Sequence, residues 1–233
     1  MKAIILAAGR STRLYPITLS MPKCLLKVGE KTIIERQIDN LTEIGIKDIL
    51  VVTGYLKEEI EGFLKDRVRY AFFPDFAKTN NLHTLYSIRD ELDSDFICLF
   101  SDVLLGKEPL MELMNNDDDF CLLVHNKEVL EGTMRVKIKN GSVYDIGGHI
   151  PPEEGEANFI GVAKFSKKAA KLLAEEMEGM IKGENHINDY YTMALPGLAE
   201  KGYKISFINM DDKPWIEIDT KDDLDRARGM ELK

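Results

Sequence analysis

Short apolar runs alternate with amphipathic stretches along residues 1–100. Runs of four to eight apolar and β-branched residues are typical of buried strands. Strands are therefore predicted at Ala3–Ala8, Ile49–Thr53, Val68–Phe73 and Phe96–Phe100. Apolar residues at helical spacing predict helices over Thr32–Leu41, over Lys57–Leu64, and from Asn80-Asn81 along the face that carries Leu82, Leu85, Ile88 and Leu92. This order of strand and helix, with strands apolar along nearly their whole length, predicts an α/β fold.

The predicted fold is Rossmann-like, with a mixed, mainly parallel sheet and helices on both faces. Residues 126–233 follow another pattern. Asn140-Gly141 lies between two alternating segments, which favours a type I′ hairpin. A strand over Gly161–Phe165 and helices over about Lys167–Glu178 and Asp189–Lys201 follow. We expect one domain over residues 1–233, with a small C-terminal α+β lobe that covers the site at the end of the sheet.

Polar and glycine residues follow several of the predicted strands. Gly9, Thr53-Gly54, Asn80-Asn81 and Asp102 each come after a strand. In parallel sheets, ligands bind beyond the carboxyl ends of the strands. These segments are therefore expected to meet at one rim of the sheet.

The first of these turns carries the chemistry of an anion site. Gly9 leaves the backbone N–H groups accessible, while Arg10, Arg13 and Lys23 supply positive charge. The charge distribution agrees, because residues 1–31 carry a net charge of +5 in a chain of net charge −9. The alternative is a strand flanked by solvated cations, but their close spacing favours a cradle for a triphosphate.

Composition excludes several other classes. An acidic chain is a poor nucleic-acid binder, because tracking a phosphate backbone needs a broad basic face. No apolar run approaches the roughly 18 residues that span a bilayer, so we expect a cytoplasmic protein that binds no membrane. The phosphate-binding patterns of P-loop enzymes and of Rossmann dehydrogenases are both missing, which makes ATPase, kinase and hydride-transfer activities improbable.

One family fits the remaining pattern. The segments Leu6–Leu14, Pro16, Thr18, Pro22–Leu26 and Lys31–Ile34 together resemble the signature of the sugar-phosphate nucleotidyltransferase superfamily, which has a GT-A-like fold. The resemblance continues through Val52–Tyr55, Ser101-Asp102 and Trp215–Asp219. Ser11 departs from it, because the family usually has a second glycine there.

The resemblance assigns roles to individual residues. It implies that Arg13 contacts the β- and γ-phosphates and that Lys23 bridges the α-phosphate and the attacking phosphate or phosphonate. Asp102 and Asp219 are expected to hold Mg²⁺, which prefers one or two protein carboxylates together with phosphate and water. The implied reaction is in-line attack on the α-phosphorus with release of pyrophosphate.

Each carboxylate also has a plainer interpretation. Asp102 can cap a turn after its strand, and Asp219 can be the N-cap of the helix that begins near Thr220. Alternation along an extended segment can place Glu217 on the same side as Asp219. Glu217 is then either a metal ligand or a residue that contacts a metal ligand.

The nucleotide is expected to be CTP. The stretch Thr79–Ser87 resembles a segment of small CTP-dependent members such as phosphocholine cytidylyltransferases. Amide and hydroxyl groups can match the edge of cytosine, although Asn80 or Asn81 can equally act as a helix cap. The residues expected to bind the nucleotide are Leu6, Ala7, Ala8, Gly9, Arg10, Ser11, Thr12, Thr53, Gly54, Tyr55, Asn80, Asn81 and Thr84.

The acceptor is expected to be small and to carry a phosphate or phosphonate, with phosphocholine and aminoethylphosphonate as examples. Tyr190, Tyr191, Trp215 and Glu217 can surround its cationic head group, although core packing is the commoner role of such aromatic residues. Two alternatives remain open: a sugar-1-phosphate uridylyl- or thymidylyltransferase, and a nucleotide-sensing subunit without catalysis. The sequence leaves the oligomeric state open and is compatible with a homo-oligomer. Residues 1–125 would form the nucleotide-binding core, and residues 126–233 would bind the acceptor and complete the metal site.

Overall fold

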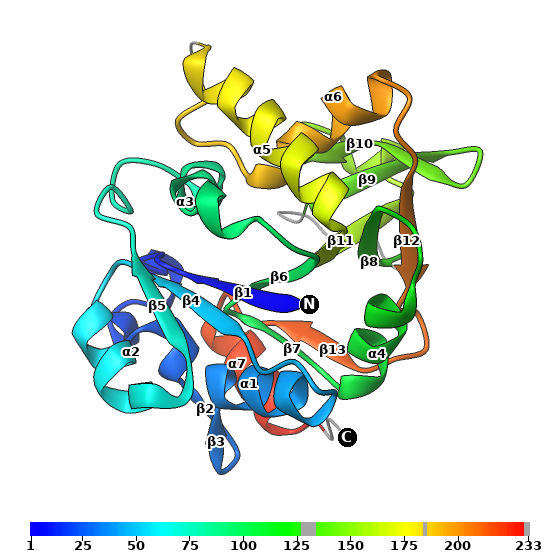
Figure 1. Cartoon of the computed structure of the whole chain (residues 1–233). Coiled ribbons are helices and arrows are strands. Elements are labelled where there is room, and N and C mark those ends of the chain that lie inside the picture. Colours follow the sequence, from blue (N-terminus) through cyan, green and yellow to red (C-terminus); the bar gives the residue numbers. More distant parts are fainter. Residues whose placement is uncertain (127–133, 184–185, 231–233) are drawn as a thin grey trace.

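A computed structural model describes residues 1–126, 134–183 and 186–230 of the chain. Its central feature is a nine-stranded mixed sheet with helices on both faces (Figure 1). Within the described ranges, no helix combines the length and the apolar character that crossing a membrane requires.

Four parallel strands form the first half of the sheet. Their bounds are β1 (Lys2–Ala7), β4 (Ile49–Thr53), β5 (Arg69–Phe72) and β6 (Phe96–Phe100), in the order β6-β1-β4-β5. β1 lies between β6 and β4, so that Ile4 is in register with Cys98 on one side and with Leu50 on the other. The predicted strands are confirmed, and β1 reaches the rim at the centre of the sheet.

Both faces of β1 are buried, because successive side chains point to opposite faces and each face meets helices. Ala3 and Ile5 pack with α1 (Ile33–Glu43), α2 (Lys57–Leu64) and α4 (Lys107–Asn115). Ile4 and Leu6 pack with α3 (Asn81–Ser87), α5 (Lys167–Lys182) and α6 (Ala194–Glu200). This arrangement explains why the strand is apolar along its whole length.

The second half of the sheet is mixed. It contains β8 (Phe120–His125), β9 (Met134–Lys139), β10 (Ser142–Gly147), β11 (Ala157–Phe165) and β12 (Ile205–Asn209). β11 runs antiparallel to β6, β8 and β9, while β12 is parallel to β8. The hairpin between β9 and β10 is confirmed, with φ values of 52° at Asn140 and 72° at Gly141 that suit a type I′ turn.

Two helix predictions needed correction. The helix expected over Asp189–Lys201 begins only at Ala194, after a 3₁₀ turn, because the backbone of Asp189 is bonded to α3 instead. The helix through Leu82 ends at Ser87 and is followed by a separate 3₁₀ turn over Arg89–Glu91.

Smaller elements complete the rim. β7 (Val103–Leu105) pairs antiparallel with β13 (Trp215–Glu217), and β2 (Lys27–Val28) pairs with β3 (Lys31–Thr32). α7 (Lys221–Arg228) follows β13 and packs its apolar residues with those of β2, β7 and β13. α7 thereby lies beside Leu14, which belongs to the loop region that follows β1.

Candidate functional site

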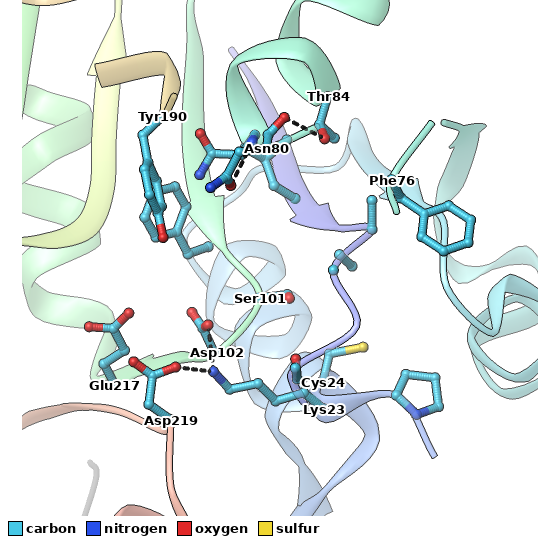
Figure 2. A pocket seen from close by; sticks show the side chains of 18 of the residues that line it. Lys23, Cys24, Phe76, Asn80, Thr84, Ser101, Asp102, Tyr190, Glu217 and Asp219 are labelled. Atoms are coloured by element: carbon cyan, nitrogen blue, oxygen red, sulfur yellow. Dashed lines mark hydrogen bonds and ion pairs between the residues drawn. The ribbon is translucent and has the colours of Figure 1, made fainter. Parts of the chain in front are cut away.

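A hollow of ≈ 220 Å³ opens where β1 and β6 end (Figure 2). The side chains of Lys23 and of three carboxylates lie at one end, and the start of α3 lies at the other. Tyr190 stands between these two ends. Most of the predicted site residues line this hollow: Leu6, Ala7, Ala8, Gly9, Ser11, Arg13, Lys23, Asn80, Asn81, Thr84, Asp102, Tyr190, Glu217 and Asp219.

The turn after β1 leaves its backbone uncovered. A Cβ atom at Gly9 would meet nothing within 4 Å beyond its chain neighbours, so no contact inside the protein requires a glycine there. The missing side chain therefore leaves room for a ligand against the backbone. Ser11 adopts a left-handed conformation with φ 50° and ψ 51°, and its carbonyl accepts a hydrogen bond of 2.8 Å from the Thr18 hydroxyl.

Lys23 lies at the centre of a charged network. Its Nζ is 2.7 Å from Asp102 Oδ2 and 2.7 Å from Asp219 Oδ1, and an Arg13 nitrogen is 2.8 Å from the same Asp219 oxygen. Burial alone would lower the pKa of Lys23, but the two carboxylates outweigh burial and raise it. A buried ammonium group is therefore held at a fixed position facing the hollow.

The short ribbon of β7 and β13 brings the two aspartates together. Asp102 directly precedes β7, and Asp219 follows two residues after Glu217, the last residue of β13. Glu217 is in register with Val103, and the Ile218 N–H donates to the Asp102 carbonyl at 3.0 Å. This pairing places residues from distant parts of the chain on one side of the hollow.

The helix-cap interpretation of Asp219 does not hold. Thr220 is the N-cap of α7, and its side chain and that of Asp223 form a capping box. The Asp219 N–H donates to Asp223, which leaves the Asp219 carboxylate turned toward Lys23 and Arg13.

Three carboxylates at this end fit a divalent cation. Asp102, Glu217 and Asp219 each offer an oxygen within 4.8 Å of the others. Asp102 Oδ1 is buried and has no hydrogen-bond partner among the described residues. Burial, followed by the charges of Asp102 and Asp219, raises the pKa of Glu217 to about 8. A hard cation such as Mg²⁺ would relieve this repulsion and satisfy the unpartnered oxygen.

The start of α3 forms the other end of the hollow. Asn80 is the N-cap of α3, and its side-chain oxygen accepts from the Asn81 N–H, so the helix-cap interpretation holds for Asn80. Asn81 and Thr84 line the hollow beside it. These groups offer amide and hydroxyl functions about one helical turn apart, which suits the edge of a base.

A second hollow of ≈ 310 Å³ adjoins the first. The two share Arg13, Phe100, Tyr190, Glu217 and Asp219 as common lining. Burial raises the pKa of the Tyr190 hydroxyl, which is therefore a neutral hydrogen-bonding group at neutral pH. The arrangement offers two neighbouring binding spaces that meet at one cluster of charges.

Sequence reasoning missed several residues of the second hollow: Met134, Arg135, Gly148, His149, Phe159, Gly161, Asn188 and Met193. Gly161 has a φ of +82° in the middle of β11, an irregular strand position that the sequence signals only as a glycine inside an apolar run. Arg135 and His149 belong to the hairpin region, and nothing in their local pattern shows that this hairpin faces the rim.

Two predicted acceptor residues lie elsewhere. Tyr191 is fully buried, and its ring contacts those of Phe100 and Phe165 in the core. Trp215 packs beside His125, with ring centroids 5.5 Å apart, and lines neither hollow. Both side chains pack in or against the core. Of the four predicted acceptor residues, only Tyr190 and Glu217 face the hollows.

Five predicted nucleotide residues also line neither hollow: Arg10, Thr12, Thr53, Gly54 and Tyr55. Thr53 is buried and bonded to Glu61, while a Cβ at Gly54 would lie 2.7 Å from the Ala8 carbonyl oxygen. Tyr55 donates to the Leu19 carbonyl and lies under the Arg10 guanidinium. Gly54 and Tyr55 lie against Ala8, since the Tyr55 N–H donates to the Ala8 carbonyl at 3.0 Å.

Comparison with known proteins agrees with this geometry. The nucleotidyl transferase family model matches residues 2–119. The chain is 30% identical to a CTP:phosphoglutamine cytidylyltransferase of Campylobacter jejuni over 97% of this chain and 98% of that protein. It is 46% identical to a choline-phosphate cytidylyltransferase of Streptococcus pneumoniae, over 42% of this chain and 43% of the relative.

Solved structures extend the likeness to the whole fold. A CTP:phosphocholine cytidylyltransferase from Streptococcus pneumoniae superposes with a TM-score of 0.83 at 25% identity, covering 98% of this chain and 97% of that one. The match therefore includes the lobe built by the second half of the sheet as well as the N-terminal motif. The chain belongs to the nucleotidyl transferase family, and it is a nucleotidyltransferase.

Proposed function

We propose that this enzyme transfers CMP from CTP to a small acceptor that carries a phosphate or phosphonate, with release of pyrophosphate. The observation that carries the proposal is the charged network of Lys23, Arg13, Asp102 and Asp219, all of which line the first hollow, while Arg13 and Asp219 line the second hollow as well. The first hollow would hold the nucleotide, and the second would hold the acceptor. In this division, residues 1–125 form the nucleotide-binding core and residues 126–233 bind the acceptor and complete the metal site.

The proposed reaction needs two anions close together. The acceptor oxyanion attacks the α-phosphorus, a new P–O bond forms, and the bond to the β-phosphate bridging oxygen breaks as pyrophosphate leaves. Lys23 contributes a buried positive charge in the first hollow, and Arg13 contributes a second one at the wall that the two hollows share. Their roles are to hold both phosphates in line and to balance the charge that develops in the transition state.

Asp102 and Asp219 are proposed to hold Mg²⁺, with Glu217 beside them. The cation would supply charge neutralisation and orientation to the phosphates. A cation there would be a second partner for both carboxylates that contact Lys23, and the Lys23 ammonium would then be free to contact the substrates.

The choice of CTP is supported by two observations. The relative that matches over nearly the whole of both chains is a CTP-dependent enzyme by name, and so is the solved structure with a TM-score of 0.83. Asn81 and Thr84 line the hollow, and Thr84 lies at the end opposite the charged network (Figure 2). We propose that they read the cytosine edge, while Gly9 and Ser11 contact the triphosphate through their backbone.

The second hollow supports a cationic or zwitterionic acceptor. Asp189 and Glu217 supply acidic groups and Tyr190 supplies an aromatic face, which together suit an amine or a quaternary ammonium group. Phosphocholine, aminoethylphosphonate and a phosphorylated amino-acid amide all fit this description.

The test is pyrophosphate release with Mg²⁺ across CTP, UTP, dTTP, ATP and GTP. Each nucleotide is paired with phosphocholine, phosphoethanolamine, aminoethylphosphonate, inositol phosphate, phosphoglutamine and glucose 1-phosphate. The proposal predicts turnover with CTP and an amine-bearing acceptor. Turnover only with glucose 1-phosphate and UTP or dTTP would identify a sugar nucleotidyltransferase, and nucleotide binding without turnover on any pair would contradict the proposal in favour of a sensing role.

A further inference from the structure

The walls of the two hollows are joined by hydrogen bonds. The Asn80 N–H donates to the Ile187 carbonyl at 3.0 Å, and the Leu82 N–H donates to the Asp189 carbonyl at 3.2 Å. The start of α3, which lines the first hollow, is thereby tied to the segment that lines the second.

Two side-chain amides strengthen this link. Asn80 Nδ2 donates to the Asn188 carbonyl at 3.1 Å, and Asn81 Oδ1 accepts from the Tyr191 N–H at 2.8 Å. The two amides therefore have opposite roles: Asn80 donates a hydrogen bond to the segment, and Asn81 accepts one from it. Asn80 also uses its oxygen to cap α3, whereas Asn81 Nδ2 has no hydrogen-bond partner within the described ranges.

The tied segment has two further contacts of its own: His83 Nε2 of α3 lies 3.3 Å from the His186 carbonyl oxygen, and His186 Nδ1 lies 2.6 Å from Asp189 Oδ2. Residues 186–190 belong to no helix or strand, yet Asn188, Asp189 and Tyr190 all line the second hollow. The next residue, Tyr191, is anchored by its ring in the core. The position of the acceptor wall therefore depends on the hydrogen bonds from α3 on one side and on this anchor on the other.

We propose that Asn80 and Asn81 are positioning residues for the acceptor, in addition to bordering the nucleotide. Their amides hold Asn188, Asp189 and Tyr190 in place across the junction of the two hollows. This inference rests on the proposed function, and it deepens that function by naming the residues that connect the two substrates.

Aspartate substitutions separate the two amides. Asn80→Asp keeps an oxygen for the cap of α3 but replaces the donor to the Asn188 carbonyl with a repelling oxygen. Asn81→Asp keeps the oxygen that accepts from the Tyr191 N–H and removes only the unpartnered amide donor. Both variants add one negative charge at adjacent positions, so each serves as the charge-matched control of the other.

The expected results differ in which substrate is affected. A net hydrogen bond corresponds to about a threefold to tenfold change in binding, so Asn80→Asp is expected to raise the acceptor KM by that factor relative to Asn81→Asp. The CTP KM is expected to rise more in Asn81→Asp, because that variant loses the free donor. Asn81→Ala should raise the acceptor KM, and Asn81→Asp should restore it.

The measurement is steady-state pyrophosphate release with CTP and the acceptor that the wild type uses best, together with the thermal midpoint of each variant. Equal acceptor KM values in Asn80→Asp and Asn81→Asp, or an Asn81→Ala variant whose acceptor KM is unchanged, would overturn the inference while leaving the proposed function standing. A wild type that turns over no pair would overturn both, and that result is obtained before any variant is made.

Discussion

The two hollows differ in how they are built. The floor of the first is formed by Leu6–Gly9 and Ser11, which present mainly backbone and small side chains. The second is walled by larger side chains from β9, from β11, from the segment before α6 and from β13. A surface made of backbone suits a group that is the same in every substrate, such as a triphosphate. Side chains in the wall of the second hollow can be substituted to suit another acceptor without altering the nucleotide site. The two hollows meet at Arg13, Glu217 and Asp219, and Lys23 contacts Asp219 from the side of the first hollow.

The strongest test removes the positive charge of Lys23, which contacts Asp219, a residue that lines both hollows. We expect Lys23→Ala to lower turnover by about a hundredfold or more, because a preorganised charge at the transition state is lost. The fold should survive, since the side chain lines the hollow instead of packing into the core. Initial rates of pyrophosphate release measure the first effect, and circular dichroism measures the second.

Lys27→Ala is the matched control for that variant. Lys27 is exposed, lies four residues further along the chain and lines neither hollow. Its rate should stay within twofold of the wild type. Unchanged turnover in Lys23→Ala would remove Lys23 from the mechanism.

A second test addresses the cation. Asp102→Asn keeps the shape of the side chain but loses a charged ligand, so we expect about a tenfold to hundredfold weaker response to Mg²⁺. A magnesium titration of the rate measures this response, with the exposed Asp90→Asn as the control. A normal magnesium dependence in Asp102→Asn would return Asp102 to the role of a turn residue.

The pH dependence of stability gives a third test. Glu217 has a pKa of about 8 in the folded protein and 4.5 as its ordinary value, so the folded state binds the extra proton between these limits. Stability without metal should therefore fall as pH rises from about 4.5 to about 8 and level off above that. Glu217→Gln should remove this fall, with a relative gain on the order of 2 kcal/mol at pH 8.5 and little at pH 4.

Urea unfolding of both proteins across this range measures the difference, and Mg²⁺ should stabilise the wild type more as pH increases. Parallel pH profiles for the wild type and Glu217→Gln would contradict the assignment of the raised pKa to Glu217.

Two glycines allow a paired test, because Gly9 lines the first hollow and Gly54 packs against Ala8 outside it. Gly9→Ala should leave stability nearly unchanged and weaken CTP binding about tenfold, because the new methyl group enters the hollow. Gly54→Ala should lower the free energy of unfolding by about 1–3 kcal/mol, because its Cβ would lie 2.7 Å from the Ala8 carbonyl oxygen. Calorimetry measures CTP binding and thermal unfolding measures stability. An equal loss of stability in both variants would contradict the prediction.

The smallest expected effect is at Ser11. Its left-handed conformation is unfavourable for a residue with a side chain, so Ser11→Gly should stabilise the protein by about 0.5 kcal/mol after the larger unfolded-state entropy of glycine is subtracted. The CTP affinity should stay the same or rise slightly. A loss of stability in Ser11→Gly would show that the serine side chain has a supporting contact.

Several residues that the sequence singles out line the first hollow, because they are close together along the chain. Gly9, Arg13 and Lys23 lie close together along the chain, directly after a strand whose apolar pattern is unambiguous. Asp102 and Asp219 were linked only through a family resemblance, because β7 and β13 are three-residue strands with no detectable period. Their pairing becomes visible only in the fold.

The second hollow was predicted poorly for a physical reason. Tyr190 and Tyr191 are neighbours, yet one faces the hollows and the other fills the core, and no sequence pattern distinguishes them. Arg135 lies on β9, which pairs with β11, and His149 follows β10, which pairs with β9, so both reach the second hollow through the order of the strands. An acceptor site assembled from distant strands requires the sheet order, which a single sequence does not specify.

The most direct test of the two-hollow account is a crystal structure of the protein soaked with CTP and Mg²⁺ and no acceptor. The account predicts the triphosphate against Gly9 to Arg13, the base beside Asn81 and Thr84, the cation between Asp102 and Asp219, and solvent in the second hollow. A nucleotide bound in the second hollow, or a cation held away from both aspartates, would contradict it.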